Sequence, residues 1–174
     1  MFDAMRFEVI RIKEGHTPLN WTGELTGLDL CFDGESPPEP IEFTGEVSRL
    51  GDLVTVRGTV VTELGRECDR CLGSATLKVS AEFLALIKIL RRDETPETLQ
   101  EDENDPLIPV AYDTAHVDLS GHVREAVLLA LPMATYCKSD CLGLCPVCGA
   151  DMNTEPCDCD RPTDARWAAL EALK

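Results

Sequence analysis

Basic residues are scarce in this sequence. Lysine and arginine together number 16 against 32 aspartates and glutamates, which gives a formal net charge of -16 and a pI of about 4.4. Binding to nucleic acid without sequence preference depends mainly on Lys and Arg side chains that neutralise phosphates. The composition therefore argues against such binding, and it favours either a basic protein partner or simple solubility.

The sequence also lacks an export signal and a membrane-length apolar run. Charged residues interrupt the amino-terminal apolar residues at Asp3, Arg6, Glu8 and Arg11. This pattern predicts no secretory signal and no export. The longest apolar run lies around 127–133 and is far shorter than the roughly 20 residues that span a bilayer. We therefore expect a soluble cytoplasmic protein.

Motifs of catalysis are missing as well. The sequence contains no phosphate-binding loop, nucleophile elbow or dinucleotide fingerprint, and no H-x-E of the zinc deaminases. The nearest approach to a hydrolytic zinc site is His122 with Glu125, on a helix that we expect to pack against the core. His16 and His116 are isolated, and we expect them to be exposed or to cap an element. The sequence thus predicts no enzyme.

Cysteine, by contrast, is abundant. The chain has nine cysteines, an odd number that would leave one thiol over in a closed disulfide framework. In a reducing compartment, clustered thiols indicate metal binding or redox chemistry. Eight of them form four close pairs, which are Cys68/Cys71, Cys137/Cys141, Cys145/Cys148 and Cys157/Cys159. The ninth, Cys31, is flanked by Leu30 and Phe32 and is expected to be an ordinary buried thiol.

Four pairs of thiols suit two tetrahedral Zn²⁺ sites. A C-x-x-C turn supplies two ligands from one tight loop, with each sulfur about 2.3 Å from the metal. The pattern is strongest in 145-CPVCG-149, where Pro146 stiffens the turn and Gly149 allows a left-handed backbone just after the second thiol. We therefore predict two structural zinc ions.

Loop length favours one arrangement of the pairs. Only the eight residues 149–156 separate Cys145/Cys148 from Cys157/Cys159, so these two pairs close a site at little entropic cost. The other site would then join Cys68/Cys71 to Cys137/Cys141. In the competing arrangement the two middle pairs share one metal, and the first pair meets the last.

Other thiol chemistry remains an alternative. Iron in a rubredoxin-like site also takes four thiolates, and a C-x-x-C pair can be a dithiol redox centre. Such redox motifs usually open a helix in a βαβ unit, whereas Cys68 is predicted to lie in a β-hairpin turn. An iron electron carrier or a redox-sensing zinc switch therefore stays as the second hypothesis.

The chain before residue 93 predicts an antiparallel sheet. Apolar and polar residues alternate over 41–47, 53–64 and 75–90, with Gly58 indicating a bulge or a close backbone approach. A first strand is expected at 7–12, and 19–33 is expected to be an irregular segment with at most a short strand. On the 75–90 strand the outer face becomes apolar at Leu84 and Leu86, which predicts a sheet covered on both sides near its middle.

The remainder predicts one packed helix and a short terminal one. The first covers 119–131, is capped by Asp118 or Ser120, and ends before Pro132. Its predicted buried face consists of Leu119, Val123, Ala126, Val127, Ala130 and Leu131. A short helix is expected at 164–174, capped by Asp164.

These elements predict an α+β protein with two domains. Residues 1–133 form the core domain and 134–174 form a cysteine-rich zinc-binding segment with the terminal helix. Within the core domain, 93–113 holds eight acids, three prolines and no Lys or Arg, so we expect a solvated loop there.

Four motifs together resemble the bacterial YceD family, the large ribosomal RNA subunit accumulation proteins. They are 67-ECDRCL-72, 125-EAVLLALP-132, 137-CKSDCLGLCPVCGADMNTEPCDC-159 and 164-DARWAALEALK-174. The resemblance covers roughly residues 40 to 174, and the chain has DAR where DPR is common. It implies a cytoplasmic, non-enzymatic role in accumulation or processing of large-subunit rRNA, with the family's cysteine pattern on all eight paired cysteines.

Charge limits how such a role could be performed. A chain at -16 is repelled by RNA, so we expect it to act through a basic ribosomal protein or an rRNA-processing factor. Arg66, Arg70 and Lys138 lie beside the thiols in sequence, where they could offset the charge of four thiolates. Any direct contact with RNA is expected at these three residues.

Overall fold

The computed structural model describes residues 5–23, 40–94, 107–155, 157–160 and 166. The chain divides into two compact units. The first unit contains Met1–Arg66 and Thr76–Met133, and the second contains Glu67–Ala75 and Ala134–Lys174. The segment 67–75, which connects two strands, thus belongs with the cysteine-rich carboxyl-terminal part.

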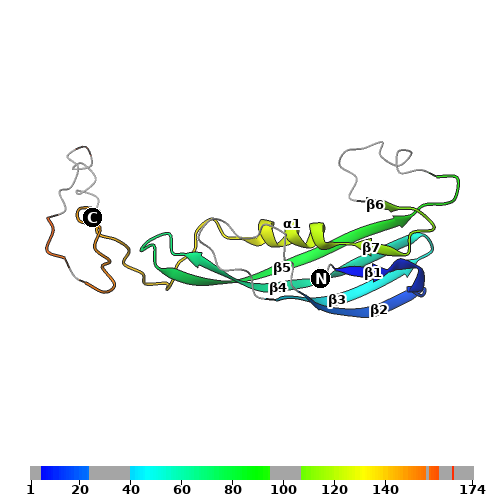
Figure 1. The fold of residues 1–174 in the computed structure, drawn as a ribbon, viewed down its shortest axis with the longest axis horizontal. Coiled ribbons are helices and arrows are strands. Elements are labelled where there is room, and N and C mark those ends of the chain that lie inside the picture. Colours follow the sequence, from blue (N-terminus) through cyan, green and yellow to red (C-terminus); the bar gives the residue numbers. More distant parts are fainter. Residues whose placement is uncertain (1–4, 24–39, 95–106, 156, 161–165, 167–174) are drawn as a thin grey trace. The chain divides into compact units, whose positions relative to one another are not determined.

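A five-stranded sheet in the order β2-β3-β4-β5-β6 dominates the fold (Figure 1). Its strands are β2 (Gly15–Gly23), β3 (Ile41–Leu50), β4 (Leu53–Glu67), β5 (Ser74–Ile89) and β6 (Leu107–Val110). Strand β3 pairs antiparallel with both β2 and β4, whereas β6 pairs parallel to β5. A two-stranded antiparallel sheet of β1 (Arg6–Glu8) and β7 (His116–Asp118), the 3-10 turn η1 (Val9–Arg11) and the helix α1 (Ser120–Ala130) complete the described elements.

The core lies on one face of the large sheet. Alternate side chains of β3, β4 and β5 are buried there, as the period-two pattern predicts. Helix α1 runs along the sheet (Figure 1), and its Val123 and Val127 are fully buried in the same cluster. Phe43 and Phe83 meet edge to face at a centroid distance of 5.7 Å, which is a favoured aromatic geometry.

Two glycines lie opposite each other in the middle of the sheet. Gly45 of β3 pairs with Gly58 of β4, and a Cβ atom on Gly58 would lie 2.4 Å from the carbonyl oxygen of Thr44. The ring of Phe43 fills the space that side chains at both positions would need. The register runs through this pair without interruption, so the close approach predicted at Gly58 is confirmed and no bulge is formed.

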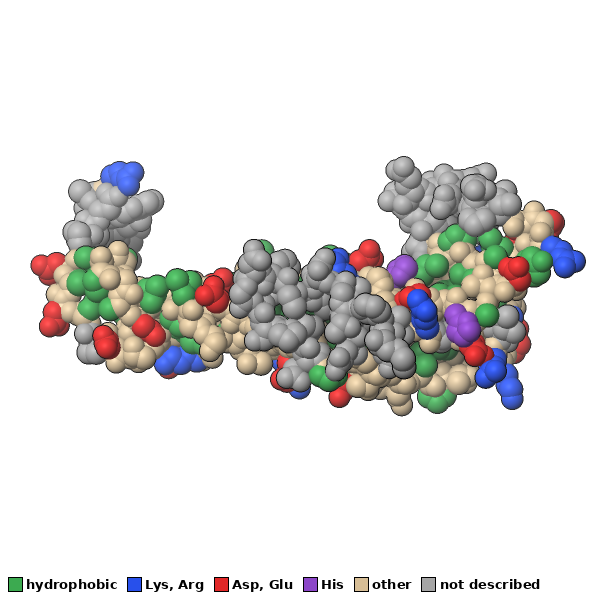
Figure 2. All heavy atoms as spheres, viewed as in Figure 1, with side chains coloured by type: hydrophobic (Ala, Val, Ile, Leu, Met, Phe, Trp, Pro, Cys, Tyr) green, Lys and Arg blue, Asp and Glu red, His purple; other side chains and the backbone are tan. Residues whose placement is uncertain are grey.

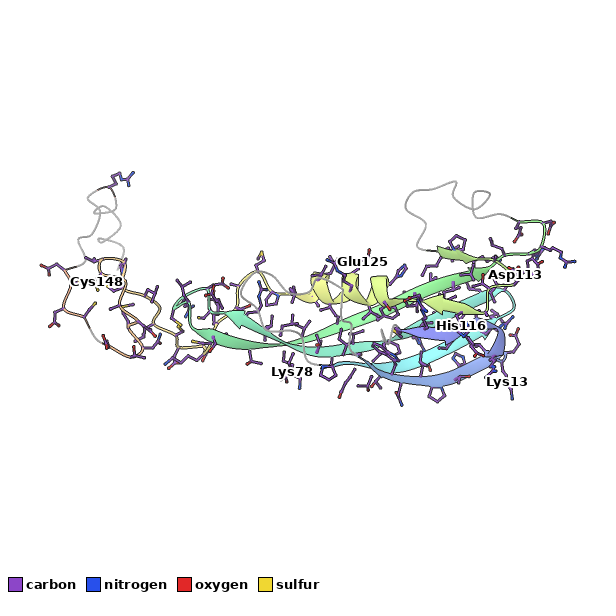
Figure 3. The ribbon with its side chains drawn as sticks, viewed as in Figure 1. Lys13, Lys78, Asp113, His116, Glu125 and Cys148 are labelled. Atoms are coloured by element: carbon purple, nitrogen blue, oxygen red, sulfur yellow. The ribbon has the colours of Figure 1, made fainter. Side chains whose placement is uncertain are left out.

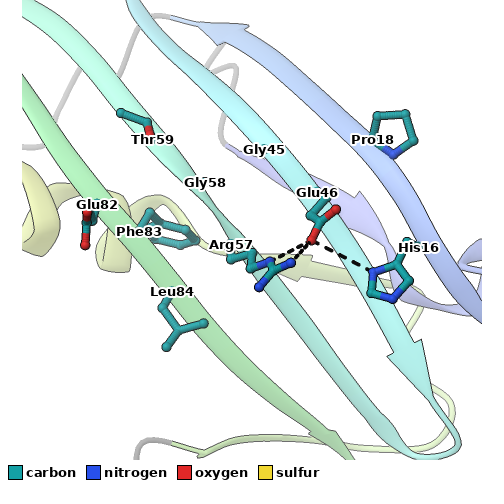
Figure 4. A pocket seen from close by; sticks show the side chains of 10 residues that line it. All are labelled: His16, Pro18, Gly45, Glu46, Arg57, Gly58, Thr59, Glu82, Phe83 and Leu84. Carbon is teal, nitrogen blue, oxygen red and sulfur yellow. Dashed lines mark hydrogen bonds and ion pairs between the residues drawn. The ribbon is translucent and has the colours of Figure 1, made fainter.

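The outer face of the sheet corrects one prediction. We expected Leu84 and Leu86 to mark a sheet covered on both sides, but Leu84 is 64% exposed, whereas Leu86, which pairs with Leu107 of β6, is half-buried. Polar groups share this face, since the Glu46 carboxylate accepts a hydrogen bond from Nε of Arg57 at 2.6 Å and lies 3.9 Å from Nδ1 of His16 (Figure 4). An antiparallel sheet needs only one apolar face against a core, so single exposed leucines are tolerated on the other.

Three predicted segments also differ from the structure. The strand expected at 7–12 is shorter, because the chain turns into η1 and brings Val9 into the core. The short strand allowed within the irregular segment 19–33 is the end of a longer regular strand, since β2 begins at Gly15 and pairs residue for residue with β3 as far as Gly23. Residues 24–33 lie outside the described residues. The solvated loop expected at 93–113 contains β6, which pairs with the edge strand β5, while 95–106 lie outside the described residues.

The start of α1 is fixed to the amino-terminal strand. The backbone N–H of Ser120 donates to Oδ1 of Asp118 at 2.9 Å, while Nε of Arg6 donates to Oδ2 at 3.1 Å. The hydroxyl of Ser120 in turn accepts from the N–H of Met5 at 3.0 Å. The cap position itself is Leu119, whose side chain makes no capping hydrogen bond. Asp118 binds the first helical N–H from one residue earlier, whereas Ser120, the other predicted cap, does not cap the helix and binds Met5. Along the helix, Ala130 is exposed where a buried position was expected.

Replacing Asp118 by alanine is expected to destabilise the first unit by about 1 kcal/mol, the usual cost of a lost amino-terminal cap. Partial burial opposes ionisation, but hydrogen bonds from Ser120 and the Arg6 guanidinium hold the pKa of Asp118 below its usual value of 3.8. The carboxylate therefore stabilises the fold above pH 3.8, and its contribution is lost as pH falls through the lower folded pKa.

Urea unfolding of wild type and Asp118→Ala at pH 7 and in acid measures this difference, with exposed Asp113→Ala as the control. A difference of the same size at both pH values would contradict the capping role.

The fold class is confirmed only in part. The described residues form a mostly antiparallel sheet with a single 11-residue helix, so the strand content outweighs the helix. Among the described residues, no helix is both long enough and apolar enough to cross a membrane. The helix expected at 164–174 and the thiol of Cys31 lie outside the described residues.

Candidate metal centre

The first cysteine cluster begins in the turn between β4 and β5. Strand β4 ends at Glu67 and β5 begins at Ser74, so Cys68 and Cys71 lie in the hairpin turn, as predicted. The N–H of Cys68 donates to the carbonyl of Gly73 at 2.8 Å, and the N–H of Leu72 donates to the carbonyl of Cys68 at 2.9 Å. Leu72 adopts a left-handed φ of 57°, an uncommon conformation for this residue type that tightens the turn.

Two hydrogen bonds between Asp69 and Thr135 join the segment after α1 to this turn. The N–H of Asp69 donates to the carbonyl of Thr135 at 2.9 Å, and the N–H of Thr135 donates to Oδ2 of Asp69 at 2.5 Å. Thr135 is 4% exposed, so its backbone groups are paired away from solvent, whereas Asp69 itself is exposed. This contact brings the segment that carries Cys137 and Cys141 to the hairpin turn.

The sulfur atoms of the first cluster have the spacing of a tetrahedral site. All four Sγ atoms of Cys68, Cys71, Cys137 and Cys141 lie within 4.8 Å of one another. Sγ of Cys68 is 3.8 Å from Sγ of Cys141, and Sγ of Cys71 is 3.7 Å from Sγ of Cys137. A tetrahedron with Zn–S bonds of about 2.3 Å has sulfurs about 3.8 Å apart. The residues present therefore fit a four-thiolate metal ion.

Arg70 is part of the framework around the first cluster. Its Nη1 donates to the carbonyl oxygen of Cys141 at 3.1 Å, and its guanidinium carbon lies 4.2 Å from the ring centroid of Tyr136. Its own carbonyl accepts from the N–H of Leu144 at 3.0 Å. Lys138 is exposed, and Arg66 ends the first of the two segments that make up the first unit. Arg70, one of the three basic residues singled out in the sequence, thus contacts a cysteine of the cluster.

The second cluster lies in a small ribbon. A β-bridge joins Leu144 to Asp151, and the N–H of Cys145 donates to the carbonyl of Ala150 at 2.8 Å. Gly149 has a φ of 76°, so the left-handed residue predicted after the second thiol is present. The second cluster consists of Cys145, Cys148, Cys157 and Cys159, whose Sγ atoms all lie within 4.8 Å of one another. Cys148 is labelled in Figure 3. The structure therefore groups the four pairs in the arrangement that loop length favours.

Replacing Gly143 by alanine is expected to weaken metal binding at the first cluster. Gly143 has a φ of 74°, and a Cβ atom would lie 2.9 Å from the carbonyl oxygen of Arg70. The left-handed conformation alone costs an alanine about 1–2 kcal/mol, and the contact with Arg70 adds to this.

Gly149→Ala is the matched control, because its φ is 76° but nothing lies within 4 Å of the added carbon. Chelator competition measures the metal affinity of each variant. Equal losses at the two positions would contradict a role for the Arg70 contact.

The thiols within each cluster ionise unequally. A backbone hydrogen bond from Cys137 lowers the pKa of Cys68 to about 6, and backbone hydrogen bonds from Cys148 and Val147 lower that of Cys145 to about 6. Burial and the neighbouring thiols raise the pKa of Cys137 to about 12. Each cluster thus forms one thiolate readily, while further ionisation builds up like charge that a divalent cation would offset.

The remaining residues noted in the sequence are not members of either cysteine cluster. Within the described part of the chain, both groups of metal-binding side chains contain cysteine only. His122 and Glu125 are exposed on α1, and Glu125 is labelled in Figure 3. His16 and His116 are exposed, as expected, beside Glu46 and Glu8.

Sequence reasoning missed Asp69, Thr135 and Asn153. Their roles depend on contacts between separate segments of the chain, although the short side chain of Asp69 directly after Cys68 was a local signal.

Comparison with known proteins shows which family this chain is similar to. Residues 56–174, which include all eight paired cysteines, match the family described as "Large ribosomal RNA subunit accumulation protein YceD". The chain belongs to the YceD family. The resemblance that the sequence motifs indicated is therefore confirmed.

Curated relatives extend from mycobacteria to plants. The YceD chain is 34% identical over 124 residues to an uncharacterized protein of Mycobacterium tuberculosis, covering 71% of this chain and 57% of that protein. It is 31% identical over 131 residues to an uncharacterized protein of Mycobacterium leprae, covering 75% and 58%. It is 27% identical over 157 residues to "Large ribosomal RNA subunit accumulation protein YCED homolog 1, chloroplastic" of Zea mays, covering 78% and 54%.

The chain thus spans between half and two thirds of the length of these relatives. No solved structure matches it.

Proposed function

We propose that this chain acts in the accumulation or processing of large-subunit rRNA, and so in ribosome biogenesis, without catalysis of its own. The observation that carries the proposal is the family match over residues 56–174. The maize relative's name describes the same role. The proposed site of action is the cytoplasm, because ribosomes are assembled in that compartment.

Two structural zinc ions complete the proposal, one in each cysteine cluster. The support is the donor set, since each cluster offers four thiols and the Cys68–Cys141 sulfur distance of 3.8 Å fits a tetrahedral ion. Zinc bound there would supply fixed cross-links between segments that have few apolar contacts of their own. In the first cluster these segments are the hairpin turn 67–75 and residues 134–141. Four protein ligands leave no open position for substrate, so the proposed role of the metal is structural.

The proposed partner is a basic ribosomal protein or an rRNA-processing factor. The net charge of -16 supports it, because phosphate contacts would be repelled over most of the surface. Acidic side chains lie on the surface of both units on the face shown in Figure 2. Direct contact with RNA is restricted in this proposal to the basic residues near the first cluster, of which Arg70 and Lys138 are exposed and Arg66 is half-buried.

Complementation of a strain lacking this protein tests the function. We expect wild type to restore the ratio of large- to small-subunit rRNA, and the double variant Cys68→Ser, Cys141→Ser to fail because the hairpin turn loses its metal. Cys31→Ser, a change outside the four pairs, is the matched cysteine control and is expected to restore the ratio. A normal rRNA ratio in cells without the protein would refute the role.

The variant Lys138→Glu distinguishes action through a basic protein partner from direct contact with RNA. If the chain acts through a basic protein, reversing one exposed charge leaves the rRNA ratio normal, and a purified ribosomal protein is retained by the variant as by wild type. Loss of rRNA accumulation with retained protein binding would instead identify a direct RNA contact at this residue.

A further inference from the structure

Asn153 belongs by sequence to the second cluster but reaches the first. It lies in the connection 149–156, which joins the two cysteine pairs of the second cluster. Its side-chain Nδ2 donates to Sγ of Cys141, a first-cluster cysteine, at 3.4 Å. A hydrogen bond to a metal-binding thiolate offsets part of its charge and fixes its orientation.

The neighbouring groups fix the orientation of this amide. The backbone N–H of Leu142 donates to Oδ1 of Asn153 at 2.9 Å, and because an N–H can only donate, the amide oxygen must face Leu142. The amide nitrogen therefore faces the sulfur. Its other hydrogen goes to Oδ1 of Asp151 at 2.6 Å, and the same oxygen accepts from the N–H of Asn153 at 2.9 Å. The Asn153 side chain is thus held at both ends.

A single short segment separates the two clusters in the second unit. The N–H of Leu144 donates to the carbonyl of Arg70 in the hairpin turn at 3.0 Å. The carbonyl of Gly143 accepts from the N–H of Met152 at 3.0 Å. Residues 142–144 therefore contact the first cluster's turn through Arg70 and the second cluster's connection through Met152. Any loosening of the connection 149–156 would move Asn153 away from Cys141.

We propose that Asn153 is a positioning residue that couples the two metal sites. Metal binding at the second site fixes the connection that carries Asn153. The Asn153 amide is thereby held against the Cys141 sulfur, which strengthens metal binding at the first site. The inference rests on the proposed binding of two metal ions. Because coupling between binding sites is reciprocal, metal at the first site strengthens the second by the same factor.

Titration of the full-length chain with Co²⁺ against a chelator tests the coupling, since four-thiolate Co²⁺ sites are coloured. The main variant is Asn153→Asp, which keeps an oxygen for Leu142 but loses the N–H to sulfur and adds a charge. Thr154→Asp adds the same charge at an exposed neighbour and is the matched control. Cys148→Ser disables the second site, and Cys68→Ser disables the first, so that each affinity can be assigned.

We expect Asn153→Asp to weaken the first site about 10- to 100-fold, the usual effect of losing a hydrogen bond to a metal ligand. Thr154→Asp should leave it within about twofold of wild type. Cys148→Ser should weaken the first site by a factor similar to that of Asn153→Asp, and combining the two changes should weaken it no further.

Three results would overturn the inference. If Asn153→Asp behaves like Thr154→Asp, the amide does not support the first site, although two metal ions can still bind. If Asn153→Asp has its full effect in the Cys148→Ser background, the amide acts without the second site and there is no coupling through it. A wild-type chain with fewer than two four-thiolate sites would refute the coupling together with the proposed pair of metal ions.

Discussion

Replacing Cys141 by serine is expected to remove the metal from the first cluster and to unfold the part of the second unit that surrounds it. Cys141 is 4% exposed, its sulfur lies 3.8 Å from that of Cys68, and serine supplies no thiolate. Structural zinc contributes about 10–16 kcal/mol of apparent folding free energy in small zinc domains, far more than the few buried side chains of this unit can replace.

Metal analysis and hydrogen exchange measure the two parts of this prediction. Amides of 67–75 and 134–144 should lose protection, whereas amides of the first unit's sheet should keep theirs, because its core is separate. Ser139→Ala changes an exposed residue between Cys137 and Cys141 and is expected to keep both metal content and protection. Full protection of the hairpin turn in Cys141→Ser would show that the metal does not hold it.

Replacing Phe43 by alanine is expected to destabilise the first unit by about 3–5 kcal/mol, the usual cost of truncating a buried aromatic ring. Phe43 is 1% exposed, packs edge to face on Phe83, and fills the space beneath Gly45 and Gly58. No side chain at either glycine can move in to fill the cavity. Denaturant unfolding followed by circular dichroism measures the loss as a lower midpoint with an unchanged slope.

Leu84→Ala is the matched control for the sheet. Leu84 lies next to Phe83 on β5 but faces outward and is 64% exposed, so its truncation is expected to change stability by less than about 0.5 kcal/mol. A large loss in Leu84→Ala would show that the outer face is covered after all.

The cysteine grouping could be predicted because it depends on short-range features. The eight-residue connection 149–156 limits which sulfurs can meet, and the left-handed Gly149 follows from the C-x-x-C turn itself. The contacts that support the clusters could not be predicted in the same way. The pairing of Asp69 with Thr135 and of Asn153 with Cys141 requires the chain to be folded first.

The same distinction applies to the sheet. Strands β3, β4 and β5 carry their own alternation of apolar and polar side chains, and their residues were predicted. Strand β2 has little alternation and β6 follows an acidic stretch, so each is determined by its pairing with β3 or β5. The burial of Leu84 was predicted wrongly because an apolar residue in a strand can be buried only if another part of the chain packs over it. The sequence of the strand does not show whether such a part exists.

Metal content and identity per chain, measured on protein purified without chelators and read together with thiol reactivity, show directly whether the clusters hold structural zinc. We predict two zinc ions per chain and eight thiols that react slowly until the metal is removed. Iron in the clusters, or no metal with fast-reacting thiols, would contradict the assignment of structural zinc and make a redox function the leading hypothesis.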